Sequence, residues 1–180
     1  MSEVSFEFDE VGDLWAITRN EDGDSSGFGS HLAHAPAGDL GRWQFPATSD
    51  PERYDSPKMF RHGDDLYLVA RRDLGGPFDQ GLNSLPFTER RMRYLAAYSA
   101  RPKRTALYSI DRTRRKVVHL LDLPSAGDNA LPSVHRIGTH EFLVANYTSD
   151  PGHADWTWME GQVHPEGTGI YLTTISFVPR

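Results

Sequence analysis

Two arginines, Arg19 and Arg71, end similar short segments of the chain and could bind a carboxylate together. The segment DLWAITR ends at Arg19 and the segment DLYLVAR ends at Arg71, at an offset of 52 residues. A guanidinium group presents a fork of N–H donors that matches the two oxygens of a carboxylate. If the two segments occupy equivalent places in the fold, both arginines reach one acidic ligand. The alternative is that each arginine ends a strand and pairs with a nearby acidic residue at the surface.

A longer repeat adds further polar residues at these positions. Residues 55–73 (DSPKMFRHGDDLYLVARRD) align without a gap with residues 130–148 (ALPSVHRIGTHEFLVANYT), at an offset of 75 residues. Asn146 then corresponds to Arg71, and Tyr147 corresponds to Arg72. We therefore predict that Arg72 and Asn146 also contribute to binding a small acidic ligand.

Two aspartates could supply a general acid and a general base. Asp55 lies two residues before Pro57, and Asp128 lies four residues before Pro132, in each case just ahead of a predicted strand. A pair of carboxyl groups can donate and accept the protons that cleavage of a glycosidic bond requires. An aspartate before a strand also commonly accepts hydrogen bonds from backbone N–H groups, so a purely structural role fits the sequence as well.

Two tryptophans, Trp156 and Trp158, lie in a segment that interrupts the repeat. An indole ring can stack on a sugar ring, and it can equally pack its own segment onto the rest of the fold. We include both residues among the predicted ligand-binding residues.

Strands must position these side chains, because the repeated segments have the composition of β-structure. The segments 66–70 and 142–145 are apolar at every position, which indicates strands that are buried on both faces. Sheets that pack face to face around an axis bury their strands in this way. The sequence predicts an all-β fold of antiparallel four-stranded meanders, arranged as about three propeller-type blades. The three predicted modules are residues 4–51, 56–124 and 130–178, and together they form a single domain of residues 1–180. The last strand of the first module is predicted at residues 42–45.

Two insertions interrupt the repeat, at residues 74–103 and at residues 150–167. Long insertions in a compact β fold are often functional loops. The first insertion contains a predicted helix with Thr88 as its N-cap. One face of that helix would carry Met92, Leu95, Ala96 and Ser99.

Several stretches resemble the blade rhythm of sialidase-like and of invertase- or arabinanase-like glycosidase propellers. They are the arginine that ends a strand, GSHLAHA at 29–35, DLGRW at 39–43, and DSP at 55–57 before a strand ending in YLVAR. The stretch GDNALPS at 127–133 is similar to the entry to a blade in bacterial sialidase-like proteins. The resemblance covers most of the chain outside the insertions and implies a five- or six-bladed propeller with BNR-like repeats.

The resemblance also implies a function and roles for individual residues. It implies a glycoside hydrolase module that cleaves or binds glycans in an axial cleft. The resemblance implies that Asp55 protonates the leaving oxygen and that Tyr147 is a nucleophile. Asp128 would either adjust the acidity of Asp55 or act as the partner base. The alternative is a non-catalytic propeller that binds a ligand or a protein partner. No segment supplies a complete Asp-box, which favours the alternative.

Composition and charge limit the other classes of function. The chain has 180 residues, a net charge of −6 and no cysteine, which excludes disulfides, thiolate metal sites and thiol catalysis. Its eight histidines have no metal-binding spacing and no nucleotide-binding motif is present, so we expect neither metal nor cofactor. The start MSEVSFE lacks the features of a signal peptide, and no apolar run reaches the length of a membrane span. We therefore expect no membrane partner and favour the cytoplasm.

The remaining expectations concern partners. Residues 89–116 carry a local charge of +8, but no nucleic-acid-binding motif accompanies them, so we do not expect a nucleic-acid partner. About three blades cannot close a ring, because propellers usually have about four to eight. We expect a partial ring that is completed by further blades or by self-association.

Overall fold

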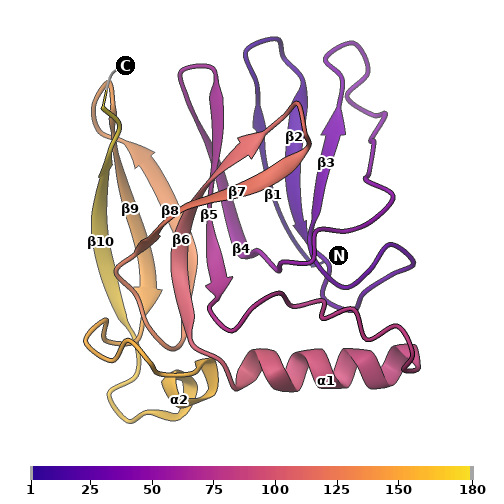
Figure 1. Cartoon of the computed structure of the whole chain (residues 1–180). Coiled ribbons are helices and arrows are strands. Elements are labelled where there is room, and N and C mark those ends of the chain that lie inside the picture. The colour runs from indigo at the N-terminus through magenta and orange to yellow at the C-terminus, as the bar shows by residue number, and fades with distance from the viewer. Residues whose placement is uncertain (1, 179–180) are drawn as a thin grey trace.

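The computed structural model describes residues 2–178, which form three antiparallel sheets that stand side by side (Figure 1). Each sheet is a meander in which consecutive strands pair. We refer to the three sheets as the first, second and third blades. The first blade contains β1 (Glu3–Phe8), β2 (Leu14–Arg19) and β3 (His31–Ala35). The second contains β4 (Asp55–His62), β5 (Asp65–Asp73), β6 (Lys103–Asp111) and β7 (Lys116–Leu123), and the third contains β8 (Asn129–Arg136), β9 (Glu141–Thr148) and β10 (Gly169–Ser176).

The three predicted modules correspond to these three blades, but only the second blade has four strands. The predicted strand at residues 42–45 is reduced to a single bridge between His34 and Gln44. Pro46 follows this short segment and has no N–H group with which to extend the ladder. The first and third blades are therefore three-stranded among the described residues.

The repeat between the second and third blades is confirmed in the backbone of their inner strands, although the pairing register differs by one residue, since Lys58 pairs with Val69 but the equivalent Ser133 pairs with Ala145. Ser56 in β4 and Leu131 in β8 both have φ of 49°, and they are 75 residues apart. The pairing of β4 with β5 shifts between Asp55 and Lys58, and the pairing of β8 with β9 shifts between Ala130 and Ser133. Each shift spans a proline, Pro57 in β4 and Pro132 in β8, and proline has no N–H group to donate to the neighbouring strand. The two blades thus begin with the same local distortion.

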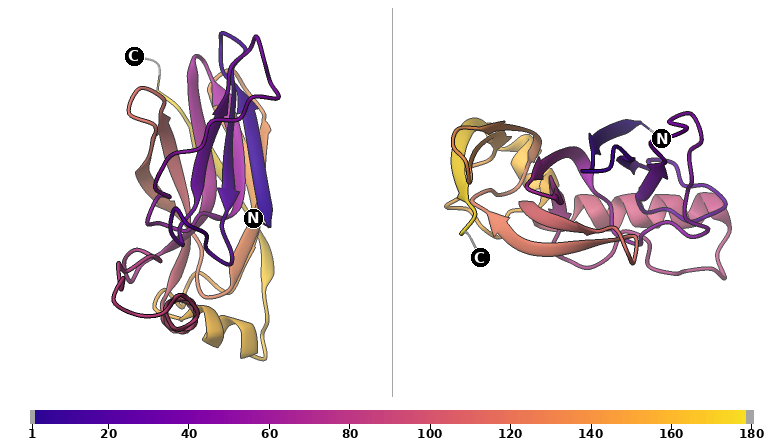
Figure 2. Two further views of the ribbon diagram at one scale, coloured as in Figure 1. Left: turned by 90° about the vertical axis from the view of Figure 1, so that its right-hand side faces the viewer. Right: turned by 90° about the horizontal axis from the view of Figure 1, so that it is seen from above.

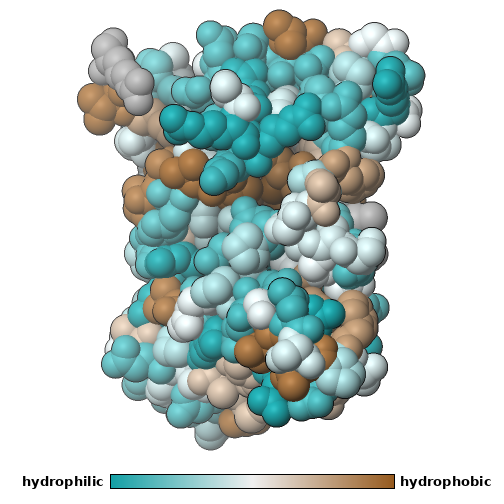
Figure 3. Space-filling model, turned by 45° about the vertical axis from the view of Figure 1, so that its right-hand side comes forward, coloured by the Kyte–Doolittle hydropathy of each residue, from teal (hydrophilic) through white to brown (hydrophobic). Residues whose placement is uncertain are grey.

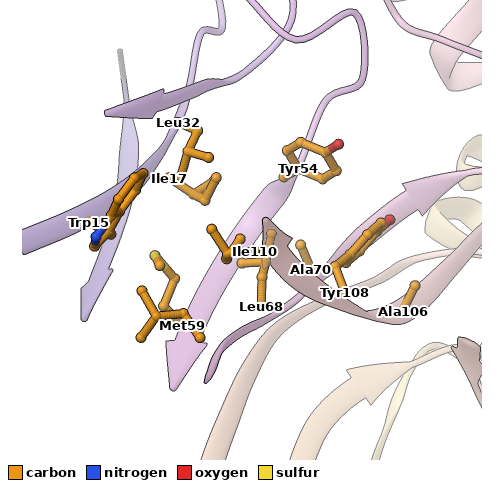
Figure 4. Close-up of a cluster of buried hydrophobic side chains, with 11 residues drawn as sticks. Trp15, Ile17, Leu32, Tyr54, Met59, Leu68, Ala70, Ala106, Tyr108 and Ile110 are labelled. Atoms are coloured by element: carbon orange, nitrogen blue, oxygen red, sulfur yellow. The ribbon is translucent and has the colours of Figure 1, made fainter. Parts of the chain in front are cut away.

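The blades pack face to face, with β1, β4 and β8 as neighbouring inner strands (Figure 2). One cluster of buried side chains joins the first blade to the second, and Figure 4 shows Trp15, Ile17 and Leu32 facing the strands of the second blade. A second cluster joins the second blade to the third through Phe60, Val69, Leu107, Leu123, Phe142, Val144 and Ile175. These two interfaces use opposite faces of the second blade, as in a propeller.

The prediction that the second strand of each module is buried on both faces is confirmed for β5 but is wrong for β9. In β5, Leu66, Leu68, Val69 and Ala70 are all fully buried. In β9, residues alternate between buried and half-buried from Phe142 to Thr148. The reason is that the second blade covers one face of β9, whereas no described sheet covers the other.

Two helices lie below one end of the sheets, α1 (Phe87–Ser99) in the first insertion and α2 (Trp158–Val163) in the second (Figure 1). The predicted helix exists, but Pro86 rather than Thr88 is its N-cap residue. Its buried side chains are Tyr94 and Tyr98; of the predicted apolar face, Leu95 packs beside them but Met92 is 64% exposed. The two tyrosines pack against Phe28 and Phe78, which lie in loops that sequence periodicity does not identify. Among residues 2–178, no helix has the length and apolar character to cross a membrane.

Candidate functional site

A small pocket of about 250 Å³ lies where the inner strands of the three blades meet the helices. The first blade contributes Glu3 and Arg19, and the second contributes Ser56 and Arg71. The third blade and its insertion contribute Asp128, Ala130, Leu131, Tyr147, Trp158 and Gln162. Five of the residues predicted from the sequence therefore line one pocket, and a sixth, Asp55, lies within 3.6 Å of Arg71 without lining the pocket itself.

Strand register brings these side chains together. A residue at or near the end of each second strand pairs with a residue at the start of the inner strand beside it: Arg19 with Glu3, Arg71 with Asp55, and Tyr147 with Ala130. Because the blades pack with their inner strands adjacent, these equivalent ends converge. The predicted convergence of Arg19 and Arg71 is observed, with both arginines within ion-pair distance of Asp55.

Asp55 is buried, with 1% of its surface exposed, and is surrounded by cationic and hydroxyl groups. Nε of Arg53 donates a hydrogen bond to Oδ1 at 2.7 Å, and the hydroxyl of Tyr98 donates to Oδ2 at 2.5 Å. Nη1 of Arg71 lies 3.6 Å from Oδ2, and Nε of Arg19 lies 3.7 Å from Oδ1. The carboxylate thus holds three arginines in place but presents no surface to a ligand.

Asp128 lies at the wall of the pocket and is also well hydrogen-bonded. Its Oδ1 accepts hydrogen bonds from Nε1 of Trp158 at 3.1 Å and from the hydroxyl of Tyr147 at 3.4 Å. Its Oδ2 accepts one from Nε2 of Gln162 at 2.6 Å. Trp158 and Gln162 come from α2, so this helix is fastened to the third blade through the same carboxylate that lines the pocket.

Arg71 connects the two carboxylates. Its Nη1 donates to the hydroxyl of Tyr98 at 3.3 Å, and its Nε donates to the carbonyl oxygen of Asn129. Its Nη2 lies 3.6 Å from Oδ1 of Asp128, which is longer than a normal hydrogen bond. This end of the guanidinium group faces the pocket, where its charge is shared with Asp128 at ion-pair distance.

Burial and charge set the protonation states around Arg71. Burial opposes the charge on its guanidinium group, but Tyr98 and Asp55 outweigh that effect and raise the pKa of Arg71. Burial also raises the pKa of Tyr147, and the nearby charge of Asp128 raises it further. At neutral pH the pocket therefore contains a charged arginine and a protonated Tyr147 phenol.

Three residues predicted to bind a ligand lie elsewhere. Arg72 forms an ion pair with Asp122 at 2.8 Å, because successive side chains of a strand point to opposite faces and Arg71 takes the inner one. Asn146 is buried between the second and third blades and donates to the hydroxyl of Thr105. Trp156 stacks between His153 and His164, at centroid distances of 4.0 and 4.2 Å, so it packs its own loop.

The residues of the site that were not predicted from the sequence include Glu3, Arg53, Tyr98 and Gln162. Arg53 lies over the rings of Phe78 and Tyr98, at 4.7 and 4.9 Å from their centroids. Tyr98 reaches Asp55 from α1, so the first insertion contributes a side chain to this site. Arg53 lies two residues before Asp55, and this spacing is the only sequence signal that could have indicated its role.

Within the described part of the chain, residues 2–178, no three His, Asp or Glu side chains are grouped so that they could hold a metal ion. The carboxylates of the pocket are instead directed at arginine, tyrosine, tryptophan and glutamine donors. The chemistry available at this site is therefore hydrogen bonding and charge pairing by side chains.

Substituting Gly161 with alanine is expected to disturb the pocket wall. A Cβ at Gly161 would lie 2.1 Å from the backbone nitrogen of Asp128, so α2 would have to move away from the third blade. Overpacking of this kind typically costs about 1–3 kcal/mol. Urea unfolding of Gly161→Ala should show a loss in this range. Gly38→Ala is the matched control, because a Cβ there meets no atom within 4 Å. Equal stability of the two variants would contradict the close approach of α2.

Comparison with known proteins supports the fold. No protein-family model matches the chain, and no curated protein matches its sequence. An α-L-arabinanase of Penicillium chrysogenum, complexed with arabinobiose, has a TM-score of 0.56 and 12% identity, over 96% of this chain and 45% of that chain. The endosialidase of phage phi92 has a TM-score of 0.58 and 15% identity, over 99% of this chain and 27% of that chain. The chain thus spans less than half of the length of either structure, and at these identities the likeness shows the fold alone. It confirms the predicted resemblance to glycosidase-type β-propellers.

Proposed function

We propose that this chain is a carbohydrate-recognition propeller module whose pocket takes the carboxylate of an acidic glycan. The observation that carries the proposal is the pocket at the inner strands, where Nη2 of Arg71 faces the pocket without a hydrogen bond of normal length to Asp128 and Trp158 forms part of the wall. The arabinanase bound to arabinobiose and the phage endosialidase, which share the fold, support a glycan as the class of ligand.

The lining residues offer complementary groups for such a ligand. Nη2 of Arg71 would donate to a carboxylate oxygen, and Arg19 supplies a second positive charge. The carboxylates of Glu3 and Asp128 would accept hydrogen bonds from sugar hydroxyls, and the indole of Trp158 offers an apolar surface to a sugar ring. A site with few, convergent polar groups of both signs suits a polar ligand that carries one negative charge.

Hydrolysis is the second candidate, and the contact between Tyr147 and Asp128 favours it. In that reaction the phenol oxygen of Tyr147 bonds to the anomeric carbon while its proton passes to Asp128. The glycosidic bond breaks, and the departing oxygen takes a proton from solvent. Water would then release the sugar from Tyr147. Asp55 is too deeply buried for the role of acid and would act only by positioning the arginines.

A fluorescence titration with N-acetylneuraminic acid tests the recognition proposal. Trp158 lines the pocket, so binding should change the protein's fluorescence, and this change should be absent in Trp158→Phe. The methyl ester of the same sugar is the matched ligand without a carboxylate. We expect it to bind about tenfold more weakly, which corresponds to ~1.4 kcal/mol. Equal affinity for acid and ester would contradict carboxylate recognition, and absence of binding by both would contradict this acidic sugar as ligand.

A separate assay decides between recognition and hydrolysis. The 4-methylumbelliferyl glycoside of N-acetylneuraminic acid releases a fluorescent product when it is cleaved. If Tyr147 is the nucleophile, Tyr147→Phe should abolish release while the affinity for the free sugar changes little. Binding without any release by the wild-type protein would leave recognition as the function and exclude hydrolysis of this substrate.

A further inference from the structure

The first blade has an uncovered apolar face. Val4, Phe6 and Phe8 alternate along β1 and are 64%, 59% and 40% exposed. The intervening residues of β1 face the second blade, where the hydroxyl of Ser5 accepts a hydrogen bond from the backbone of Met59. A strand that is apolar on the face turned away from its neighbour is typical of a strand that is covered on both sides. One face of β1 is covered by the second blade, but nothing in the described chain covers the face of Val4, Phe6 and Phe8.

The third blade has an uncovered apolar face at the opposite end of the row of blades. Ile170 and Leu172 of β10 are 76% and 65% exposed. The other face of this blade packs on the second blade through Phe142, Val144 and Ile175. The exposed face therefore corresponds in position to one that a further blade would bury.

These two faces are the two halves of a blade interface. Within the chain, each contact between blades joins two unlike faces: the face of one sheet that is turned toward the next blade in the sequence, and the face of that next blade that is turned back toward it. The first blade lacks a neighbour on one side, and the third blade lacks one on the other. Exposed apolar side chains of this size suit burial in a contact between proteins. Figure 3, which brings the right-hand side of Figure 1 forward, shows hydrophobic side chains gathered in a band across this side of the molecule.

We propose that two copies of this chain close a six-bladed ring, in which the β1 face of each copy covers the β10 face of the other. Three blades are half of six, which is within the usual range of about four to eight. One chain supplies both halves of the interface, so a twofold axis creates two identical contacts. Both uncovered faces of each copy are then buried. A different protein would have to match both unlike faces at once, which a second copy does by construction.

The ring would also complete the wall of the pocket. The inner strands β1, β4 and β8 line the axis, and a second shallow pocket of about 300 Å³ runs along Glu3, Ser56 and Leu131 beside the first one. In the dimer, the inner strands of the partner copy would close the open side of this cleft. The proposal rests on the blade faces and holds whether or not the pocket binds a glycan.

Sedimentation equilibrium and light scattering of the full chain test the proposal. The expected species has twice the 20.3 kDa mass of one chain. Phe6→Glu and Leu172→Glu each place a charge on one of the two faces, and each should yield a monomer. Both positions are exposed in one copy, so folding should be preserved, which circular dichroism checks. Met92→Glu, at an exposed apolar position on α1, is the control and should remain a dimer.

Mixing the two monomeric variants provides the sharpest result. A pair formed from Phe6→Glu and Leu172→Glu chains has one contact with both charges and one contact that is wholly wild-type. The mixture should therefore form dimers that neither variant forms alone. A monomeric wild-type chain would overturn the proposal, as would an open filament or a mixture that stays monomeric. Disruption by only one of the two variants would also overturn it, since that is the behaviour of a dimer built from two identical faces.

Discussion

Replacing Asp55 with asparagine should lower the free energy of unfolding by about 3–5 kcal/mol, the usual cost of breaking a buried ion pair. Its carboxylate accepts hydrogen bonds from Arg53 and Tyr98 and lies within 3.7 Å of Arg19 and 3.6 Å of Arg71. A neutral amide would leave these buried guanidinium groups without their shared counter-charge. It would also place the amide NH₂ group of asparagine against Arg53 or Tyr98, which both donate hydrogen bonds to Asp55 and need an acceptor there.

Urea unfolding followed by circular dichroism measures this loss. Asp122→Asn is the matched control, because Asp122 pairs with Arg72 by two hydrogen bonds on the exposed outer side of the second blade. Exposed ion pairs contribute only about 0–1 kcal/mol, so this variant should unfold almost as the wild type does. If Asp55→Asn were no less stable than Asp122→Asn, Asp55 would not be the centre that holds the arginines.

The repeat in the sequence predicted the strands and their grouping because strands that occupy equivalent places in a fold need similar apolar patterns. The offset of 75 residues reappears as equal backbone distortions at Ser56 and Leu131. The same reasoning placed Arg19 and Arg71 together, since the ends of equivalent strands converge when blades pack around an axis. Fold and part of the site therefore follow from one sequence feature.

The partners of these residues could not be predicted in the same way. Tyr98 contacts Asp55 only because α1 begins at Phe87 and turns its tyrosine face toward the sheets. The alignment of Asn146 with Arg71 is correct in sequence, but Asn146 points between two blades whereas Tyr147 reaches the pocket. The reason is that β9 pairs with β8 in a register shifted by one residue relative to the pairing of β5 with β4, and a one-residue shift turns a side chain to the other face of the sheet.

Aromatic residues in the insertions were equally ambiguous. Trp156 and Trp158 are two residues apart, but the first stacks on histidines of its own loop and the second donates to Asp128. The difference arises because a capping box between Thr157 and Glu160 starts α2 between them. Only Trp158 is then carried by the helix to the pocket. A helix of six residues gives too short a pattern to be recognised in the sequence.

Replacing Arg71 with lysine should weaken binding of N-acetylneuraminic acid by about 1.5–3 kcal/mol, or roughly 12- to 150-fold. Lysine keeps the positive charge beside Asp55 and Asp128 but has a single ammonium group in place of a fork. It cannot satisfy Asn129, Tyr98 and a ligand carboxylate at the same time, as the three nitrogens of Arg71 can. The loss should therefore appear in affinity for the ligand more than in stability.

Arg72→Lys is the control for this experiment, since Arg72 is the adjacent residue and is directed at Asp122 on the other face of β5. Its affinity for the sugar should equal that of the wild type. Both variants should bind the methyl ester alike, because the fork of Arg71 acts only on a carboxylate. If Arg71→Lys and Arg72→Lys bound the acid equally well, carboxylate recognition by Arg71 would be wrong. If Arg71→Lys lowered the affinity for the acid and for the ester to the same extent, Arg71 would support the shape of the pocket and would not recognise the negative charge of the ligand.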